Sequence, residues 1–443
     1  MRSKLVRSAV LLAALGLIAA ACGDSGSSSS TPTTTKATTA TTAGGSATTA
    51  GGSATTAAAT GVCDASKPSI KIGGVGQVAF FAGMDDGINA RIGRENKTCI
   101  QGRKLEFVGL KDDGSDAQKN LDLNKSLVET DKVFALINTS AVMLPQTTNY
   151  LADKKVPYFG WGFMPGFCGA ASWGYSFNGC LSGYAFDKSK TVSVPGAKLN
   201  SSLIDPIATI VGKTADKMSI VYFNSDDDSG HAGDLQYAAL FKNILDKEFV
   251  PTKGVTDFTQ YVNIVKAKNP DAVMLSTDFA TAVKLKAAII AGGYKGIVYD
   301  YTTYIPGLLD SSKDTAAALE GGYSNTQFPP SEEGKPATQQ IATDLTAIGK
   351  PAFVTQGGSI GYWSTDLLIQ MLKAIKGDIT PDNFRTVAEG GFTYTPLDGG
   401  IGPISYPAGH FNPAPCAAIV QVKNGKYVSV VPFKCYSLVT PTS

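Results

Sequence analysis

The chain has 443 residues and a formal net charge of +2, from 39 Lys and Arg against 37 Asp and Glu, and it contains only two His. This balance, with no basic stripe, excludes a nucleic-acid surface and a polybasic membrane patch. The scarcity of His leaves few groups that exchange protons near neutral pH, which favours binding over acid–base catalysis. The part from Pro68 onward is long for a single hydrophobic core and suits two lobes.

The N-terminus has the three-part pattern of a secretory signal, in which basic residues precede an apolar run from Ala9 to Ala20. Residues 18–22, Ile-Ala-Ala-Ala-Cys, resemble a bacterial lipobox, where a peptidase cuts before a lipidated cysteine. The apolar run is shorter than the roughly 20 residues of a spanning helix. We therefore expect a signal peptide over 1–21 and a lipid on Cys22 that anchors an extracytoplasmic protein to the cell membrane. The alternative is an ordinary signal peptide with a chance cysteine.

Residues 23–61 consist almost entirely of Ser, Thr, Ala and Gly, with Thr-Thr-Ala-Gly-Gly-Ser-Ala at 41–47 and again at 48–54. Such a stretch cannot bury enough apolar surface to offset chain entropy. We predict a disordered tether over 22–67, with a root-mean-square span on the order of 35 Å. A helix is the alternative, and the Gly pairs and Thr runs argue against it.

Besides Cys22 the chain has six cysteines. An even number of cysteines in an exported protein favours disulfides. The expected pairing is local, although other pairings also fit the sequence. It joins Cys63 to Cys99, Cys168 to Cys180, and Cys416 to Cys435. Zinc is the rival explanation, but there is no Cys-x-x-Cys motif and His is scarce, so we expect no metal.

Short apolar runs alternate with amphipathic segments from Ile70 onward. The first series predicts strands at 70–75, 105–110, 133–138 and 156–160, and helices at 83–94, 117–129 and 145–154. After a loop-rich stretch, the second series predicts helices at 201–214, 232–247 and 280–292, and strands at 218–223, 272–276 and 296–299. Repeated βαβ units of this length predict parallel sheets with helices on both faces. The expected fold class is therefore α/β with two Rossmann-like lobes.

The C-terminal part has a different pattern. Amphipathic helices are predicted at 361–376 and 383–389, the second with Thr380 as its cap and Pro381 in its first turn. Strands at 417–422 and 427–431, joined through Asn424-Gly425, predict a hairpin. Cys416 and Cys435 lie near its open end, although a simple two-residue turn would not place them directly opposite each other.

Several segments together resemble the branched-chain-amino-acid type of periplasmic binding proteins, the receptors of ABC importers. They are Ile-Lys-Ile-Gly-Gly-Val-Gly-Gln at 70–77, the acidic-ended strand at 102–113, the passage at 124–136, Val-Pro-Tyr-Phe-Gly at 156–160, and 257–294 with Asn-Pro-Asp-Ala-Val-Met-Leu and Ala-Gly-Gly-Tyr. Their order and spacing carry the resemblance over most of 68–305, and more weakly over 361–376. It implies the type I fold, with two lobes joined by three crossing segments. We expect lobe 1 over 68–195 with 327–400 returning to it, and lobe 2 over 196–326 with a hinge and hairpin at 401–443.

The resemblance also implies where the ligand binds, beyond the carboxyl ends of the strands, as is general for open α/β sheets. The expected ligand-binding residues are Phe80 and Phe81 after the first strand, Thr139, Ser140 and Ala141 after the third, Trp161, Gly162 and Phe163 after the fourth, and Asp228, Ser229, Asp278, Phe279, Tyr301 and Thr302 in the second lobe. Amino-acid-binding members have an acidic residue where Thr302 stands, and often Tyr where Asp278 stands. Asp278 or Asp300 could replace the missing carboxylate. Ordinary core packing is the alternative for each aromatic residue.

The function implied is that of a solute-binding lipoprotein of an ABC importer. It would capture a small amino acid or related amphipathic ligand as a monomer, with a membrane permease as partner, no cofactor and no enzymatic activity. A surface sensor with the same fold is the alternative. A serine esterase-like hydrolase is a third, because Gly357-Gly-Ser-Ile-Gly361 fits a nucleophile elbow and His410 follows it. Ser359 as the cap of the helix at Gly361 explains this motif more simply.

Overall fold

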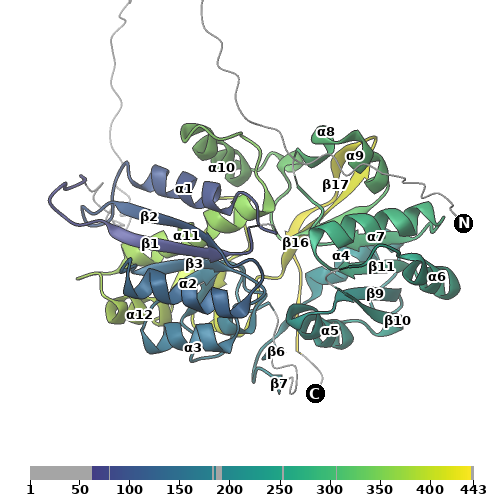
Figure 1. Cartoon of the computed structure of the whole chain (residues 1–443), viewed down its shortest axis with the longest axis horizontal. Coiled ribbons are helices and arrows are strands. Elements are labelled where there is room, and N and C mark those ends of the chain that lie inside the picture. The colour runs from purple at the N-terminus through teal and green to yellow at the C-terminus, as the bar shows by residue number, and fades with distance from the viewer. Residues whose placement is uncertain are drawn as a thin grey trace, which may run out of the picture. The chain divides into compact units, whose positions relative to one another are not determined.

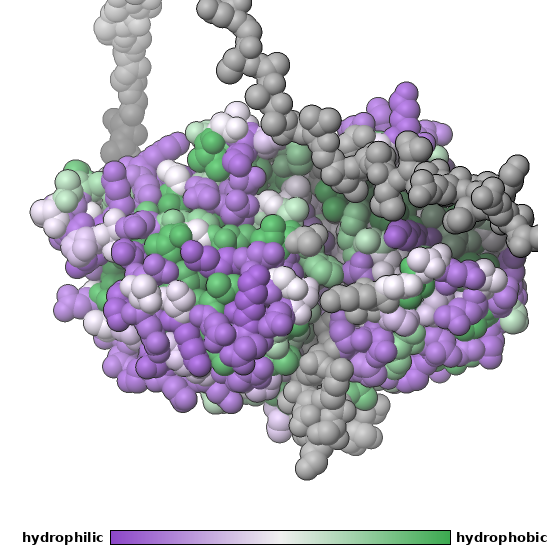
Figure 2. Space-filling model, viewed as in Figure 1, coloured by the Kyte–Doolittle hydropathy of each residue, from purple (hydrophilic) through white to green (hydrophobic). Residues whose placement is uncertain are grey.

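The computed structural model describes residues 62–78, 80–181, 184–185, 192–251, 254–305 and 307–440. The predicted signal peptide, Cys22 and most of the predicted tether lie outside these residues. Within the described ranges, no helix is both long enough and apolar enough to cross a membrane. The face seen in Figure 2 is largely hydrophilic, with apolar residues in separate patches.

The first half of the fold is a parallel sheet with the strand order β2-β1-β3-β4-β5, and its first three strands are labelled in Figure 1. Its strands are β1 (Ile70–Gly76), β2 (Leu105–Asp112), β3 (Ala135–Thr139), β4 (Tyr158–Gly160) and β5 (Gly174–Ser176). One face packs against α2 (Ala117–Glu129) and α3 (Pro145–Asp153). The other packs against α1 (Met84–Glu95) and three helices from late in the chain, α10 (Pro336–Ala347), α11 (Gln356–Ala374) and α12 (Pro381–Glu389). Burial on both faces explains why β3 consists entirely of buried residues.

The second half is a mixed sheet with the order β10-β9-β11-β12-β13-β16-β17. Its strands are β9 (Ser219–Ser225), β10 (Asn243–Val250), β11 (Ala272–Ser276), β12 (Ile297–Asp300), β13 (Tyr323–Thr326), β16 (Cys416–Lys423) and β17 (Lys426–Cys435). One face packs against α4 (Asp205–Val211) and α5 (Asp228–Leu240), and the other against α6 (Thr259–Lys268) and α7 (Phe279–Ala291). Helices α8 (Leu308–Ser311) and α9 (Lys313–Leu319) contribute to a cluster with the hairpin β16–β17. The predicted α/β fold class is confirmed.

Short elements complete the described chain. They are the strands β6 (Tyr184–Ala185), β7 (Val192–Ser193), β8 (Leu199–Asn200), β14 (Thr393–Tyr394), β15 (Ile404–Ser405) and β18 (Leu438–Val439), and the 3-10 helices η1 (Pro165–Phe167), η2 (Ser201–Leu203), η3 (Ser331–Glu333) and η4 (Ala408–His410). Strand β18, at the C-terminal end, pairs with β8 from the middle of the chain.

In the described part, the chain passes between the two sheets from β5 to β9, from β13 to α10, and from α12 to β16. These passages contact one another: the amide Nδ2 of Asn178, after β5, donates to Oε1 of Gln327, after β13, at 2.7 Å. Ile401 and Ile404 pack in the core of the first half, so the chain joins the second sheet only at β16. The boundary expected at 401 therefore falls among residues that pack against the first sheet.

The C-terminal part of one predicted helix is wrong. The sequence pattern placed a helix over 232–247, whereas α5 ends at Leu240 and Asn243 begins β10. The helix begins earlier because Asp227 caps it, its Oδ1 accepting a hydrogen bond from the Gly230 backbone at 2.9 Å. From Asn243 onward the backbone pairs in parallel with β9, a tertiary interaction that local periodicity does not reveal.

Helix α11 begins earlier than predicted, and Ser359 is not its cap. The cap is Thr355, whose Oγ1 accepts a hydrogen bond from the Gly358 backbone at 2.9 Å. The glycines of the motif permit a close crossing with α1. A Cβ atom at Gly361 would lie 2.1 Å from the Met84 carbonyl oxygen, and one at Gly357 would lie 2.3 Å from that of Phe81. The Gly-Gly-Ser-Ile-Gly sequence is therefore explained by helix packing.

Replacing Gly361 with Ala would force a methyl group into this crossing. We expect Gly361→Ala to lower the free energy of unfolding by about 1–3 kcal/mol, the usual cost of overpacking. The matched control is Gly93→Ala on α1, whose added Cβ would meet the Ile348 Cγ2 methyl at 3.3 Å and no backbone atom. Urea unfolding of both variants checks the prediction, and equal midpoints for the two would contradict it.

Disulfides join the expected local pairs, Cys63–Cys99, Cys168–Cys180 and Cys416–Cys435. The hairpin turn at Asn424 and Gly425 has positive φ at both residues, 52° and 71°, as a two-residue turn of type I′ requires. Shifts in register between Ala417 and Val420 then bring the last pair of cysteines opposite each other. Irregular pairing, rather than a longer turn, thus aligns this disulfide.

Candidate binding site

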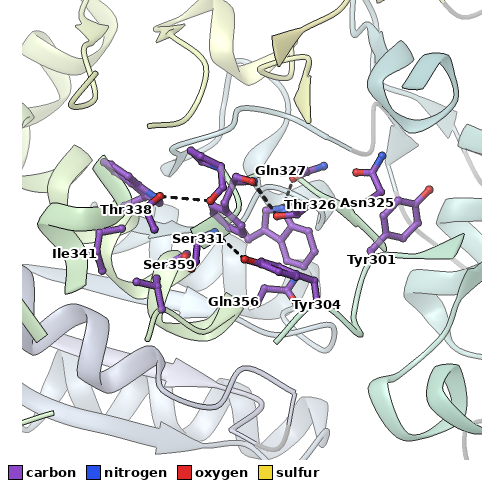
Figure 3. Close-up of a pocket in the computed structure, with 15 residues that line it drawn as sticks. Tyr301, Tyr304, Asn325, Thr326, Gln327, Ser331, Thr338, Ile341, Gln356 and Ser359 are labelled. Atoms are coloured by element: carbon purple, nitrogen blue, oxygen red, sulfur yellow. Dashed lines mark hydrogen bonds between the residues drawn. The ribbon is translucent and has the colours of Figure 1, made fainter. Parts of the chain in front are cut away.

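A pocket lies where the chain leaves β13 for α10, and residues from both halves line it (Figure 3). It contains about 580 Å³ of space between atoms, open solvent included. Its lining residues are uncharged and rich in aromatic rings, hydroxyls and amides: Trp161, Tyr301, Tyr304, Asn325, Thr326, Gln327, Phe328, Pro329, Ser331, Thr338, Ile341, Val354, Gln356, Ser359 and Trp363. An apolar pocket with a few convergent polar groups is the usual form of a small-molecule site.

Hydrogen bonds to the passage after β13 fix the indole of Trp161. Its Nε1 donates to Oε1 of Gln327 at 2.6 Å, and Nδ2 of Asn178 donates to the same oxygen at 2.7 Å. The other end of the Asn178 amide, Oδ1, accepts from the Gly162 backbone at 3.1 Å. A Cβ atom at Gly162 would lie 1.8 Å from the Gly179 carbonyl oxygen, so this close approach needs glycine. Gln327 thereby couples the orientation of Trp161 to the passage between the sheets.

The aromatic residues expected at the strand ends of the first half lie together. The Trp161 ring centroid is 6.1 Å from that of Phe81 and 5.2 Å from that of Phe163, both with edge-on geometry. Phe80 is 6.4 Å from Phe81 and is 39% exposed. Of this group, Trp161 lines the pocket. Ligand binding by the others stays a prediction.

Thr139, Ser140 and Ala141 lie where β3 ends, but they do not line the pocket. The Ala141 backbone donates to Oε1 of Gln77 at 3.0 Å, and Ser140 Oγ accepts from the Val142 backbone at 3.2 Å. The hydroxyl of Thr139 is buried without a hydrogen-bond partner among the described residues.

The expected residues of the second half have differing surroundings. Tyr301 lines the pocket, and its neighbour Thr302 has a buried hydroxyl with no partner in the described chain. Asp278 caps α7 by accepting from the Thr281 backbone at 3.0 Å, and its Oδ2 is buried and unpartnered within the described ranges. Phe279 begins α7 and is half-buried. Asp228 and Ser229 begin α5, and their side chains lie outside the described part of the structure.

Asp300 cannot serve as the carboxylate for a ligand ammonium, so this conjecture is wrong. It is fully buried and forms an ion pair with Lys286, which is also buried. Its Oδ1 accepts from the backbones of Thr302 and Thr303, both at 2.7 Å. Burial lowers the pKa of Lys286, while the charge of Asp300 opposes that shift. Asp300 therefore holds the loop that carries Tyr301 and does not face the ligand.

The arrangement around Ser359 does not suit hydrolysis. Ser359 lines the pocket but lies inside α11, not at a turn between a strand and a helix. His410 is fully buried, with Nδ1 3.2 Å from the Phe167 carbonyl oxygen and Nε2 2.9 Å from Oε1 of Glu389. Both of its ring nitrogens thus have partners other than Ser359, and a nucleophilic serine needs a base within hydrogen-bonding reach.

Solved structures that resemble this chain are solute-binding proteins of ABC transporters. One from Rhodopseudomonas palustris BisB5, in complex with 3,4-dihydroxybenzoic acid, is 17% identical with a TM-score of 0.61, covering 83% of this chain and 98% of that one. One from Thermus thermophilus with bound valine is 13% identical with a TM-score of 0.67, covering 84% and 97%. One from Streptococcus pneumoniae in complex with isoleucine is 15% identical with a TM-score of 0.64, covering 83% and 100%. At these identities the likeness establishes the fold.

The sequence itself gives the family. No curated protein sequence matches the chain significantly. The family described as "Periplasmic binding protein" matches residues 70–426, most of the chain. This match, together with the two-sheet fold, confirms the resemblance found in the sequence. The chain therefore belongs to the periplasmic binding protein family, with the type I fold.

Proposed function

We propose that this protein is the extracytoplasmic solute-binding lipoprotein of an ABC importer, and that it captures a small amino acid or related amphipathic ligand between its two lobes. The observation that carries the proposal is the pocket lined from both halves, with Trp161 on one side and Tyr301 and Tyr304 on the other. A ligand that contacts both halves favours the closed arrangement, which a permease can recognise. The valine, isoleucine and dihydroxybenzoic acid bound by proteins of similar fold support this ligand class.

The anchor completes the proposal. A lipid on Cys22 and a tether over residues 22–67 would hold the binding lobes near the membrane and let them reach a permease. The protein acts as a monomer with one small-molecule ligand. Cys22→Ser tests the anchor: the variant should leave the membrane fraction, and unchanged membrane attachment would contradict lipidation at this residue.

Capture is tested by mass spectrometry of small molecules that copurify with the full-length protein, followed by calorimetry with the compound identified. Trp161→Ala should weaken binding roughly tenfold or more, because an aromatic contact and its buried area are lost. Trp173→Ala is the matched control, since Trp173 stacks on Arg385 and does not line the pocket. Equal affinities of the two variants would contradict this site.

Deletion of the gene separates transport from sensing. Loss of uptake of the bound compound supports the importer. Unchanged uptake, with binding intact, would favour the alternative of a surface sensor with the same fold.

A further inference from the structure

Asn325 lines the pocket and carries a buried side-chain acceptor. Its Nδ2 donates to the Ser202 carbonyl oxygen at 2.9 Å, and because a carbonyl only accepts, the orientation of the amide is fixed. Oδ1 therefore lies on the other side of the amide. Asn325 is 2% exposed and lines the pocket, and its Oδ1 has no hydrogen-bond partner among the described residues. Buried acceptors are nearly always paired in folded proteins, so this oxygen suits a donor supplied by a ligand.

None of the described residues that line the pocket carries a positive charge that could neutralise a negative ligand. All 15 lining residues are uncharged (Figure 3). Between the lining residues Ser331 and Thr338, Lys335 lies 3.8 Å from Oε2 of Glu333 and is paired with it. Asp300 is paired with Lys286, and Glu332 accepts a hydrogen bond from the Tyr304 hydroxyl at 2.8 Å. A carboxylate buried here would lose its hydration without gaining a cation.

The remaining polar groups can serve a neutral ligand. Neither the Gln356 amide nor the Ser359 hydroxyl makes a side-chain hydrogen bond to another described residue, and both line the pocket. An amide and a hydroxyl can each donate or accept. Trp161, held by Gln327, offers a flat apolar surface. These groups match a ligand with a flat apolar body and a polar end that both donates and accepts.

We propose that the pocket selects an uncharged solute that donates an N–H or O–H hydrogen bond to Oδ1 of Asn325, such as a carboxamide, and discriminates against the matching carboxylate. This inference rests on the proposed function, because it takes the pocket as the ligand site, and it narrows the proposed ligand class from amino acids to uncharged amphipathic relatives of them. A carboxylate would face Oδ1 of Asn325 with a second acceptor. The ammonium of a zwitterionic amino acid could donate to Asn325, but none of the described lining residues carries a positive charge to pair with its carboxylate.

The test is calorimetry of the full-length protein with compounds matched in shape and different in charge: benzamide against benzoate, nicotinamide against nicotinate, and leucine. We expect each amide to bind at least roughly tenfold more tightly than its acid, which is the effect of one good hydrogen bond gained in place of a repulsion. Asn325→Ala should reduce this preference severalfold.

A second variant keeps the test informative if Asn325→Ala does not fold. Gln356→Lys adds a cation at a half-buried position of the pocket, so benzoate should gain affinity and benzamide should not. Gln339→Lys is the matched control, because Gln339 is exposed on α10 and does not line the pocket.

Three results decide the matter. Acids or leucine binding as tightly as the amides would overturn the inference and leave the proposed function standing. If no compound binds but a small molecule copurifies, a neutral donor-bearing molecule supports the inference and a carboxylate overturns it. If nothing binds and nothing copurifies, the proposed function and the inference both fail.

Discussion

Lys286→Met is expected to lower the free energy of unfolding by about 3–5 kcal/mol, because it leaves the buried carboxylate of Asp300 without its cation. Both side chains are buried, at 1% and 0% exposure. The ammonium also donates to Oγ1 of Thr303 at 2.9 Å and to the Tyr323 carbonyl oxygen at 2.6 Å, so three acceptors lose a donor at once. Urea or thermal unfolding measures the loss.

The same helix provides the control. Lys284 is exposed on α7, so Lys284→Met should change stability by no more than about 0.5 kcal/mol. The double variant Lys286→Met with Asp300→Asn should recover much of the loss, since Asn removes the unpaired charge and keeps an oxygen that accepts from the Thr302 and Thr303 backbones. A single variant as stable as the wild-type protein would show that Asp300 does not depend on Lys286.

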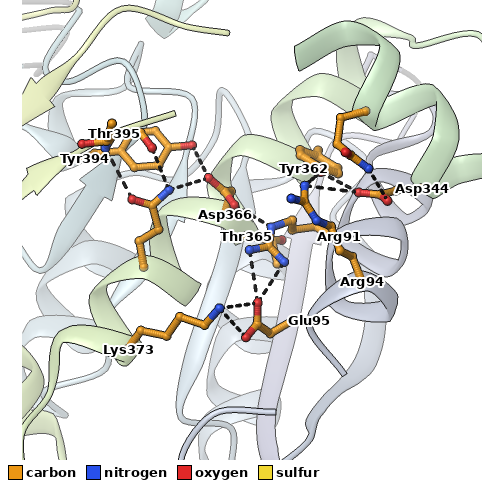
Figure 4. A network of polar contacts seen from close by, with 12 residues as sticks. Arg91, Arg94, Glu95, Asp344, Tyr362, Thr365, Asp366, Lys373, Tyr394 and Thr395 are labelled. Carbon is orange, nitrogen blue, oxygen red and sulfur yellow. Dashed lines mark hydrogen bonds and ion pairs between the residues drawn. The ribbon is translucent and has the colours of Figure 1, made fainter. Parts of the chain in front are cut away.

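Arg91→Met is the second large change, because Arg91 joins α1 to α11 through a buried polar network (Figure 4). Its Nε lies 2.5 Å from Oδ1 of Asp366, and its guanidinium donates to Glu95 at 3.2 and 3.3 Å. Although burial alone would lower it, the pKa of Arg91 is raised by Asp366 and Glu95. Among the described residues, removing the guanidinium leaves Asp366 with the hydroxyl of Tyr394 and the amide of Gln370 as hydrogen-bond partners. We expect a loss of about 3–5 kcal/mol.

Arg94 gives a matched comparison on the same helix. Its side chain is 41% exposed, and Nη1 lies 3.8 Å from Oδ2 of Asp344. Exposed pairs contribute little, so Arg94→Met should cost less than about 1 kcal/mol. Chemical unfolding of the two variants compares their losses in free energy of unfolding. Similar losses would contradict the prediction that burial increases the contribution of the Arg91 network to stability.

Much of the fold could be predicted because apolar runs and amphipathic helices alternate so regularly. Helix α2 and strand β11 have the predicted bounds, 117–129 and 272–276. Residues 243–247 of strand β10 were predicted as helix, since only pairing with β9 makes them a strand. Strand β13 was not predicted, because Tyr-Ser-Asn-Thr is short and polar and is a strand only through its neighbours β12 and β16.

The candidate site could be predicted only where it follows strand ends. Trp161 and Tyr301 line the pocket because each comes directly after a strand of its sheet. Asn325 and Gln327 were missed, since they belong to β13 and to the passage after it. The sequence could not show that Asp300 is paired, because Lys286 approaches it from a different helix. The ligand-binding roles of the other expected residues, and the lobe boundaries, stay predictions.

The position of β16 has a consequence for how the chain is made. Strand β13 pairs with β16, but the residues between them first return to build α10, α11 and α12 on the other sheet. A ribosome releases the N-terminal end first, so the edge of β13 has no partner until synthesis is nearly complete. Open strand edges pair readily with other chains. A chain that stops before Cys416 would therefore keep an unpaired strand edge at β13. Newly made copies need protection from intermolecular pairing at this edge until β16 and β17 have been synthesised.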